Sequence, residues 1–427
     1  MITSSVWAGK TFGVYGLART GKSVIATLTA SGARVAAWDD GEAARAAFDG
    51  ELTDLNTADL GKLDAMVVSP GVPHDAPLFQ RAVVTGIVVI GDIELFAQAR
   101  AALPRHKVVG ITGTNGKSTT AALIHHVLVA ARVPARLGGN IGAPILSEEP
   151  LAAGGVYVLE LSSFQIDLTF TLDCDVAVLL NITPDHLDRH GTMAAYAAAK
   201  ARLFAMQRPG SHAVIAVDDA YTSTIADEIG LEPGREGHVT PVTGTRVGDQ
   251  SGWPALPGPH NAQNAAAAIA TLRALGLDDD AIGAGFASYP GLPHRMERVR
   301  EIAGVAYVND SKATNPTSTA PALAAFPHVH WIAGGQPKTD ELDACLPFLG
   351  NVRAAYLIGE AAPVFAAILD GKVPVVLSAT LDRAVAAAAA AAVAGDTVLL
   401  SPACASFDQF SDYAARGTAF RSLVEAL

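Results

Sequence analysis

Cysteine and long apolar runs are both scarce in this sequence. Its three cysteines, Cys174, Cys345 and Cys404, form no C-x-x-C pair, and their odd number fits free thiols in a reducing compartment better than a disulfide framework. The longest strictly apolar stretch, Ala384–Ala394, is well short of the ~20 residues needed to cross a bilayer. The first residues also lack the basic region and apolar core of a secretion signal. We therefore expect a soluble cytoplasmic protein without membrane insertion.

Positive charge is in the minority as well. The chain contains 30 Lys and Arg residues against 42 Asp and Glu residues, which gives a formal net charge of −12. An overall anion gains little from a polyanionic partner, so the composition disfavours a nucleic-acid binder and leaves open a local basic pocket for a small phosphate ligand. Half of the 427 residues are hydrophobic, which argues against a mainly disordered chain. At roughly 150 residues per domain, the length suggests about three domains.

Short β-branched segments alternate with Ala- and Leu-rich segments along the whole chain. This alternation is typical of an α/β fold in which mainly parallel sheets are covered by helices on both faces. Helices are expected at Ser23–Ala30 and Asp75–Val84, and an irregular excursion is expected at Pro233–Gly258. The expected strands are Thr11–Tyr15, Arg34–Trp38, Ala65–Ser69 and Ile87–Ile90, then Val108–Thr112, Val156–Glu160, Val176–Leu180 and His212–Val217, then Val305–Asn309, Val329–Ala333, Ala354–Ile358 and Thr397–Leu400.

Two segments suit domain boundaries. Residues 98–107 carry basic residues and a proline, and the second series of strands closes near Gly291–Glu297. We therefore expect a Rossmann-like domain at residues 1–97, a central P-loop-type ATPase domain at residues 98–297 and a Rossmann-like domain at residues 298–427. Closure of the third domain over a ligand would then turn about Glu297–Gly304.

Two glycine loops resemble phosphate-binding loops. The pattern G-x-x-x-x-G-K-[ST] is matched strictly only at Gly16–Ser23, whereas the segment with Gly113–Thr119 has isoleucine where the pattern requires its first glycine. A nucleoside triphosphate site also needs a lysine, a hydroxyl for Mg²⁺, and carboxylate or imidazole groups. Such groups follow the second loop, because Glu160 and His186 each come at or just past the end of an expected strand. Carboxyl ends of parallel strands converge on one crevice, so we expect both residues to face Ser118 across a metal site.

The first loop is better explained as a dinucleotide-type turn. It follows the expected strand Thr11–Tyr15, and its glycines permit close approach of the backbone to a phosphate. Asp39 ends the second expected strand, about where an acidic residue would meet a ribose hydroxyl. This loop predicts a bound nucleotide diphosphate, with purely structural glycines as the alternative.

A series of sequence blocks extends over nearly the whole chain. They are Gly113–Thr119, Glu160–Phe164, Asn181 with Asp185–Asp188, His260–Asn264, Gly291–Arg295, Asn309–Asn315, Gly334–Lys338 and Leu400–Phe410. In this order they resemble the Mur ligases, ATP-dependent enzymes that add amino acids to the peptidoglycan precursor. The last three blocks are similar to those of the D-glutamate-adding members. The resemblance implies a ligase that joins D-glutamate to UDP-N-acetylmuramoyl-L-alanine through an acyl phosphate, and we expect a monomer.

The resemblance also implies residues for ATP and Mg²⁺. Lys117 would hold the β- and γ-phosphates, Ser118 would bind one Mg²⁺, and Glu160 and His186 would bind a second. Lys200 matches a family lysine that becomes carbamylated, which converts a cation into an anion that helps hold a metal ion. The implied ATP-binding residues are Gly113, Thr114, Asn115, Gly116, Lys117, Ser118, Thr119, Asn261, Asn264, Arg295 and Asp310, and the implied catalytic residues are Lys117, Glu160, His186, Lys200 and Arg295.

Two substrate pockets are implied in the same way. The residues implied for the UDP-sugar substrate are Gly16, Leu17, Ala18, Arg19, Thr20, Asp39, Ser69, Gly71 and Asn140, and those implied for D-glutamate are Lys312, Thr314, Lys338, Ser406, Phe407 and Tyr413. Cations and hydroxyls suit the two carboxylates of D-glutamate. Two positions depart from the family pattern. Tyr413 stands where phenylalanine is expected, and Asp40 and Gly41 follow Asp39 where the family often has a hydroxyl and a basic residue.

Other functions remain open from the sequence. A folylpolyglutamate synthase or a different Mur enzyme would share the ATP site but not the Leu400–Phe410 block. An NAD(P)-dependent oxidoreductase would use the Gly16 loop and Asp39, but it would leave the Lys117 loop, Glu160 and His186 unexplained. A non-catalytic binding protein would leave the charged site residues unexplained.

Overall fold

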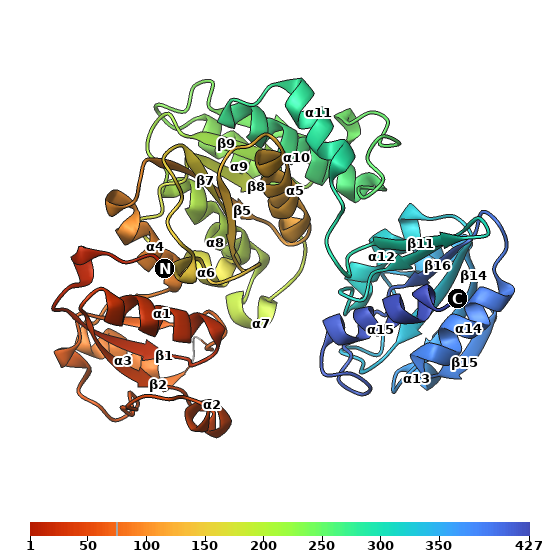
Figure 1. The fold of residues 1–427 in the computed structure, drawn as a ribbon, viewed down its shortest axis with the longest axis horizontal. Coiled ribbons are helices and arrows are strands. Elements are labelled where there is room, and N and C mark those ends of the chain that lie inside the picture. Colours follow the sequence, from red (N-terminus) through yellow and green to blue (C-terminus); the bar gives the residue numbers. More distant parts are fainter. Residues whose placement is uncertain (74–75) are drawn as a thin grey trace. The chain divides into compact units, whose positions relative to one another are not determined.

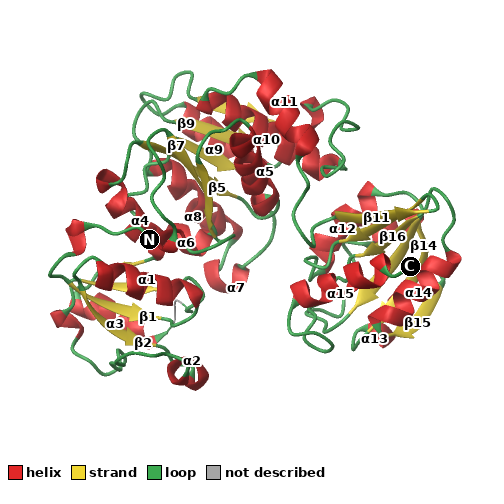
Figure 2. Ribbon diagram, viewed as in Figure 1, coloured by secondary structure: helices red, strands yellow, loops and turns green. Residues whose placement is uncertain are grey.

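The computed structural model describes residues 1–73 and 76–427. Figure 1 and Figure 2 show three sheets, each packed against helices. The chain divides into two compact units: the first comprises Met1–Arg246 with Gln263–Gly285, and the second comprises Val247–Ala262 with Phe286–Leu427. No helix within the described ranges is both long and apolar enough to pass through a membrane.

The first sheet lies in the first unit and is parallel throughout, with the strand order β2-β1-β3-β4. The expected strands of this region are confirmed, although β4 begins at Val89 rather than Ile87. Asp75, expected to begin a helix, lies outside the described residues. The elements are β1 (Thr11–Tyr15), β2 (Arg34–Trp38), β3 (Ala65–Val68) and β4 (Val89–Ile90), with α1 (Arg19–Ala30), α2 (Glu42–Ala46), α3 (Pro77–Thr85), α4 (Asp92–Ala99), η1 (Ser5–Trp7), η2 (Leu60–Lys62) and η3 (Arg100–Ala102).

The second sheet, also in the first unit, is parallel with the order β10-β9-β8-β5-β7-β6. Because β5 lies between β7 and β8, the loop after β5 is adjacent to the ends of the strands that lead to Glu160 and Asn181. The elements are β5 (His106–Thr112), β6 (Ala135–Gly139), β7 (Gly155–Glu160), β8 (Val176–Leu179), β9 (His212–Ala216) and β10 (Val239–Val242), with α5 (Lys117–Ala130), α6 (Ser163–Asp167), α7 (Leu187–His190), α8 (Met193–Ala205), α9 (Ala220–Gly230), α10 (Pro259–Leu275), α11 (Asp279–Ser288), η4 (Ile145–Ser147) and η5 (Gly244–Arg246).

The third sheet lies in the second unit and has the order β11-β12-β16-β13-β14-β15, in which only β11 is antiparallel to its neighbour. Along β13, Trp331 packs in a core with α12 and α13, whereas Ile332 packs in a second core with α14 and α15, so helices cover both faces. The elements are β11 (Glu297–Ile302), β12 (Val305–Asn309), β13 (Val329–Gly334), β14 (Val352–Ile358), β15 (Val375–Ala379) and β16 (Thr397–Leu400), with α12 (Pro316–Ala325), α13 (Ala362–Leu369), α14 (Leu381–Ala391), α15 (Tyr413–Glu425) and η6 (Leu346–Asn351).

Strands β6, β10, β11 and β15 were not expected from the sequence. β6 ends in two glycines, and β10 contains Pro241, which is tolerated there because β10 is an edge strand. The expectation of an irregular excursion was therefore wrong for Val239–Val242. The hinge expected at Glu297–Gly304 was also wrong, because Glu297–Ile302 is strand β11 and pairs along its length with β12. Its charged residues suit an exposed edge strand.

Candidate active site

The second glycine loop joins β5 to α5 and places a lysine and backbone N–H groups at a helix N-terminus. Gly116 precedes α5 with a φ of 83°, and a Cβ there would overlap the Oδ1 of Asn264, so only glycine fits. The Nζ of Lys117 donates hydrogen bonds to the carbonyl oxygens of Gly113 and Thr114, at 2.9 and 2.7 Å. A helix N-terminus with a lysine folded over the preceding loop is suited to bind phosphate groups.

Asn181, just past the end of β8, holds this loop. The N–H of Thr114 donates to the carbonyl oxygen of Asn181 at 2.7 Å, and the N–H of Asn115 donates to its Oδ1 at 2.8 Å. The Nδ2 of Asn181 donates in turn to the Oε1 of Gln263 on α10 at 2.9 Å. Neither Asn181 nor Gln263 was assigned a role from the sequence, although both lie inside the blocks that carry the resemblance.

The first glycine loop has a different geometry. Gly16 has a φ of 105°, and a Cβ there would overlap the side chain of Ser69, so the loop and the turn after β3 are in close contact. The N–H of Leu17 donates to the Asp39 carboxylate at 2.7 Å. Lys22 is exposed, and its Nζ lies 3.5 Å from a backbone carbonyl outside the loop. In the loop that matches the pattern strictly, the lysine therefore does not fold over the loop as Lys117 does in the second loop.

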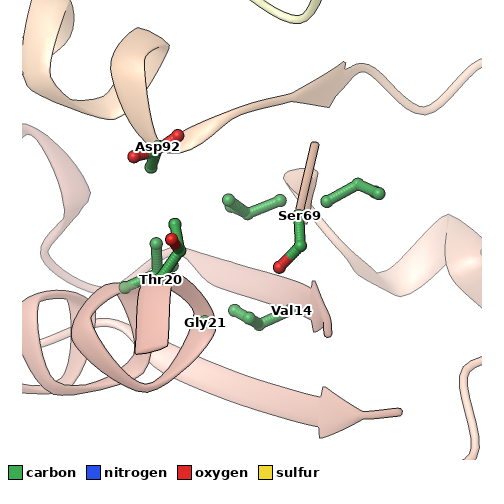
Figure 3. A pocket seen from close by; sticks show the side chains of 8 residues that line it. Val14, Thr20, Gly21, Ser69 and Asp92 are labelled. Atoms are coloured by element: carbon green, nitrogen blue, oxygen red, sulfur yellow. The ribbon is translucent and has the colours of Figure 1, made fainter. Parts of the chain in front are cut away.

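Figure 3 shows a small pocket beside the first loop. Its lining includes Thr20, Gly21, Ser69 and Asp92, the first residue of α4. Burial raises the pKa of Asp92 to about 6, and hydrogen bonds from the Ile93 N–H and from the Gln165 side chain only partly oppose the rise. Its Oδ1 has no hydrogen-bond partner among the residues described. Asp92 therefore takes up a proton more readily than an exposed aspartate, although a group with this pKa is still mostly ionised at neutral pH.

The residues after Asp39 form a network of their own. Asp40 accepts hydrogen bonds from the Tyr15 hydroxyl and from the Trp38 ring, the latter at 3.2 Å. Arg45 on α2 donates to the carbonyl oxygens of Asp39 and Asp40 at 2.8 and 2.7 Å. A basic side chain therefore reaches this turn from α2, although Asp40 and Gly41, directly after Asp39, are not basic.

The other residues expected at the first loop lie around it. Ala18 precedes α1, and Arg19 begins α1 and donates to the carbonyl oxygen of Gly142 at 3.1 Å. Gly71 is exposed in the turn after β3. The structure thus gathers the residues predicted for the UDP-sugar at the carboxyl ends of β1, β2 and β3, except Asn140, which follows β6 in the second sheet.

Glu160, the last residue of β7, lies next to Asn140, which follows β6. The Nδ2 of Asn140 donates to the Oε1 of Glu160 at 3.1 Å, and the Asn140 N–H donates to its carbonyl oxygen at 2.8 Å. Glu160 is only 2% exposed, and its Oε2 has no hydrogen-bond partner within residues 1–73 and 76–427. A buried carboxylate oxygen without a partner is costly unless a cation or donor satisfies it. This oxygen therefore fits a ligand such as Mg²⁺, which prefers oxygen donors.

His186 lies just before α7 and is exposed. Its Nε2 is 3.4 Å from the Oδ2 of Asp185, and its ring centroid is 4.8 Å from that of Phe164. Ser118, at the start of α5, is buried. Across the described chain, no group of three or more His, Cys, Asp or Glu side chains could enclose a metal ion.

Lys200 on α8 is buried, with 1% of the residue exposed. Its Nζ donates to the carbonyl oxygen of Gly113 at 2.9 Å and lies 4.5 Å from the ring centroid of Tyr196. Burial, followed by the positive charge of Lys117, lowers the pKa of Lys200 to about 6. The amine is therefore mostly uncharged at neutral pH, which is the form that reacts with CO₂.

The two asparagines implied for ATP binding, Asn261 and Asn264, are both on α10 and buried. Asn264 packs against Gly116, as described above. The Nδ2 of Asn261 donates to the carbonyl oxygen of Pro257 at 2.8 Å, near the start of the helix. The structure thus brings Asn264 to the second loop and gives Asn261 a local contact.

Asp310, directly after β12 in the second unit, connects two segments. Its Oδ1 accepts from the Met296 N–H at 3.1 Å, and its Oδ2 accepts from the Ser401 hydroxyl at 2.8 Å. Burial raises the pKa of Asp310 to about 7 against the effect of these bonds and of the Arg295 charge. Asp310 thereby ties the segment that carries Arg295 to the end of β16.

The residues expected to bind the amino acid lie on the loops after β12, β13 and β16, which are adjacent strands. The Nζ of Lys338 donates to the Oγ1 of Thr314 at 3.3 Å, and the Nζ of Lys312 lies 4.0 Å from the ring centroid of Tyr413. Ser406 is buried, whereas Phe407 is 67% exposed. The structure therefore brings cations and a hydroxyl together at one edge of the sheet, which suits a dicarboxylate.

Arg416 on α15 holds these loops and was not found from the sequence. It is buried, and its Nε and Nη2 donate to the hydroxyl and carbonyl oxygens of Ser311, each at 3.0 Å. Its Nη1 and Nη2 also donate to the carbonyl oxygens of Ala405 and Cys404, at 3.1 and 3.0 Å. In the sequence, only its position three residues after Tyr413 could have indicated that Arg416 lies near this site.

Family models match three parts of the chain. They are the Mur ligase MurD-like N-terminal domain at residues 10–91, the Mur ligase middle domain at residues 111–272 and the Mur ligase glutamate ligase domain at residues 294–404.

Similar proteins cover the whole chain. The UDP-N-acetylmuramoylalanine–D-glutamate ligase of Novosphingobium aromaticivorans is 57% identical over 430 residues, which cover 100% of this chain and 97% of that protein. The ligase of the same name from Sphingopyxis alaskensis is 56% identical, with 100% of both proteins covered. Among solved structures, a UDP-N-acetylmuramoylalanyl-D-glutamyl-2,6-diaminopimelate–D-alanyl-D-alanyl ligase from Acinetobacter baumannii has a TM-score of 0.60 at 17% identity and covers 99% of this chain and 92% of its own. At that identity, the structural likeness bears on the fold alone.

Proposed function

We propose that this chain, which belongs to the Mur ligase family, is the ATP-dependent ligase that joins D-glutamate to UDP-N-acetylmuramoyl-L-alanine in peptidoglycan precursor synthesis. The observation that carries the proposal is the pair of glycine loops. One has Lys117 folded over it next to the strand of buried Glu160. The other has Asp39 bonded to its backbone, and its exposed Lys22 contacts a backbone carbonyl outside the loop. This pair provides separate places for a triphosphate and for a nucleotide diphosphate sugar.

The reaction must first activate a carboxylate, because carboxylate resonance opposes attack by an amine. The carboxylate of the alanyl group attacks the γ-phosphorus of ATP, the bond to ADP breaks, and an acyl phosphate forms. The uncharged amine of D-glutamate then attacks the acyl carbon and loses a proton, and inorganic phosphate leaves. Phosphoryl transfer mainly requires positioning and neutralisation of charge. In this proposal Lys117 supplies that charge at the second loop.

One Mg²⁺ would be held by the Ser118 hydroxyl, and a second by the Oε2 of Glu160 and the His186 imidazole, each together with groups of the substrates. Bound there, these ions would neutralise phosphate charge and the acyl carboxylate. Asn140 orients Glu160 through its contact with Oε1. The low pKa of Lys200 supports its carbamylation, which would add an anion beside the loop.

The UDP-sugar is proposed to lie along the first loop, with its diphosphate at the backbone of Gly16–Thr20. D-Glutamate is proposed to lie between the loops after β12, β13 and β16, with its carboxylates at Lys312, Lys338 and Thr314. Arg295 and Asp310 are further residues proposed to bind ATP. We further propose the three-domain division given above, with the last domain starting at or before Glu297 because β11 starts there, and a cytoplasmic monomer.

The test is to identify the product by mass from purified enzyme, UDP-N-acetylmuramoyl-L-alanine, ATP and each glutamate enantiomer. We expect an amide product with D-glutamate only. ¹⁸O placed in the alanyl carboxylate should appear in the released phosphate, since the acyl phosphate carries one of its oxygens away. Product formed only with L-glutamate or a diamino acid would favour a different Mur enzyme or a folylpolyglutamate-type ligase. Absence of the label from phosphate would exclude the acyl phosphate.

A further inference from the structure

Arg189, on the short helix α7, contacts two of the proposed sites at once. Its Nη1 donates hydrogen bonds to the carbonyl oxygens of Pro70 and Val72, each at 3.2 Å. These residues belong to the turn after β3, which carries Ser69 and Gly71. The bonds span more than a hundred positions of sequence and join the first sheet's turn to a helix of the second sheet, within the first unit.

The same guanidinium also stacks on the opposite wall. Its central carbon lies 3.9 Å from the ring centroid of Phe164, and that ring lies 4.8 Å from the ring of His186. Phe164 is on α6, only a few residues after Glu160. Arg189 therefore forms a continuous bridge from the turn at residues 69–72 to the residues proposed to surround the acyl carboxylate.

Stability alone does not explain this placement. The Nε and Nη2 of Arg189 are buried and have no hydrogen-bond partner in the described part of the chain. Burial lowers the pKa of Arg189, which reflects the cost of removing the charge from water. Within the described chain, the contacts of this guanidinium are therefore those of Nη1 with the turn and of its face with the Phe164 ring.

We propose that Arg189 is a positioning residue that fixes the turn at residues 69–72 relative to Phe164 and His186. It thereby sets the distance between the turn that contacts the UDP part of the substrate and the residues that surround its alanyl carboxylate. The inference rests on the proposed function for the identity of the substrate. Its structural part, the tethering of the turn, does not depend on that identity.

Arg202 on α8 provides a matched control. Its guanidinium also donates to two backbone carbonyl oxygens, those of Asp167 and Thr169 at 3.3 and 3.1 Å, and it stacks 5.4 Å from the ring of Phe170. All these contacts remain within the second sheet's layer. Arg202 also forms an ion pair with Asp167 at 3.6 Å. Arg202→Met therefore removes the same kinds of hydrogen bond and ring contact, and an ion pair in addition, without touching the turn.

The first arm of the test measures hydrogen exchange and needs no substrate. The Val72 N–H is bonded to the carbonyl oxygen of Ser69 at 3.0 Å. In Arg189→Met we expect its exchange to accelerate by about tenfold or more, because loss of the tether lets the turn open. Arg202→Met should leave it unchanged. Equal exchange in wild type and Arg189→Met would overturn the proposal, whatever reaction the enzyme catalyses.

The second arm compares UDP binding with turnover. We expect Arg189→Met to lower kcat with UDP-N-acetylmuramoyl-L-alanine about 10- to 100-fold through misplacement of the reacting group. Ser69 is held independently by its N–H bond to Tyr15 at 3.0 Å, so UDP should bind with full stoichiometry and a Kd within about threefold of wild type. Arg189→Lys, which keeps donors for the two carbonyls, should recover most of the rate.

Other results of this arm would contradict the proposal. A parallel loss of UDP affinity would show that Arg189 contacts the diphosphate directly, and a lowered stoichiometry would show a merely structural defect. Wild-type enzyme that forms no amide with D-glutamate would refute the proposed function, and the exchange experiment would still decide the role of Arg189.

Discussion

The Nζ of Lys200 and the carbonyl oxygen of Gly113 are joined by a hydrogen bond of 2.9 Å. The bond connects a buried lysine in the middle of α8 to the first glycine of the loop that Lys117 also contacts through the same carbonyl. Two lysines therefore meet at one loop. Burial and the nearby Lys117 charge keep the amine of Lys200 mostly uncharged at neutral pH, since they lower its pKa to about 6.

The carbamate of Lys200 should therefore form at a lower pH than the carbamate of an ordinary lysine. Only an uncharged amine reacts with CO₂, so we expect a carbamate signal in ¹³C NMR with labelled bicarbonate that persists at neutral pH and disappears as the pH falls through about 6. Exposed Lys107 should give no signal under these conditions. Lys200→Ala should remove the signal and slow turnover, and short carboxylic acids should restore part of the rate. Full activity of Lys200→Ala would exclude Lys200 from the site.

The two glycine loops offer a matched pair of lysine variants. Lys117→Ala should lower kcat by at least about 10²-fold, because it removes a preorganised cation from the phosphates. Lys22→Ala should change kcat and KM by no more than about twofold, since Lys22 is exposed and makes one long backbone contact. Steady-state kinetics and circular dichroism of both variants provide the check. A larger loss of kcat in Lys22→Ala than in Lys117→Ala would mean that the first loop, not the second, binds the triphosphate.

Much of the fold could be predicted because parallel strands carry strong local signals. The runs that became β5, β7 and β8 are short, apolar and β-branched, so Glu160 could be placed at a strand end from the sequence. β6 gave no such signal, and its position beside β7 is what brings Asn140 to Glu160. β11 was missed because its alternating charges suit only an edge strand, a property set by the finished sheet.

Contacts between distant segments could not be predicted in the same way. The roles of Arg189 and Arg416 depend on backbone carbonyls, which every residue has and which leave no mark in the sequence. The overlap of Asn264 with any side chain at position 116 depends on where α10 packs. The burial of Lys200 also arises from packing, because a lysine within an alanine-rich helix ordinarily points to solvent.

Tyr413, where the family pattern has phenylalanine, should act mainly through its ring. The Nζ of Lys312 lies 4.0 Å from the ring centroid, a position that the ring itself stabilises. Tyr413→Phe should therefore change the KM for D-glutamate by no more than about twofold, whereas Tyr413→Ala should raise it by about tenfold through loss of the cation–π contact. Tyr221→Ala, at an exposed position on α9, serves as the control. A large effect of Tyr413→Phe would assign a function to the hydroxyl instead.

Asp310 should make the stability of the second unit depend on pH. Burial raises its pKa in the folded state from 3.8 to about 7, so between these values the folded chain binds more protons than the unfolded chain. Its contribution to stability is therefore fully present below about pH 4 and is lost as the pH rises to about 7, by up to about 1.4 kcal/mol per pH unit. Asp310→Asn cannot titrate and should lack this part of the pH dependence.

Hydrogen exchange in β12 and β16 is the suitable measurement for this effect, because the Asp310 N–H is bonded to the carbonyl oxygen of Leu400. The difference in opening free energy between wild type and Asp310→Asn should shift in favour of the variant as the pH rises from 4 to 7. Other groups titrate in this range, so only the difference is informative. Asp340→Asn, at an exposed position in the same unit, should show no such shift. A constant difference for Asp310→Asn would mean that Asp310 stays ionised when buried, held by Arg295 and by the Ser401 hydroxyl.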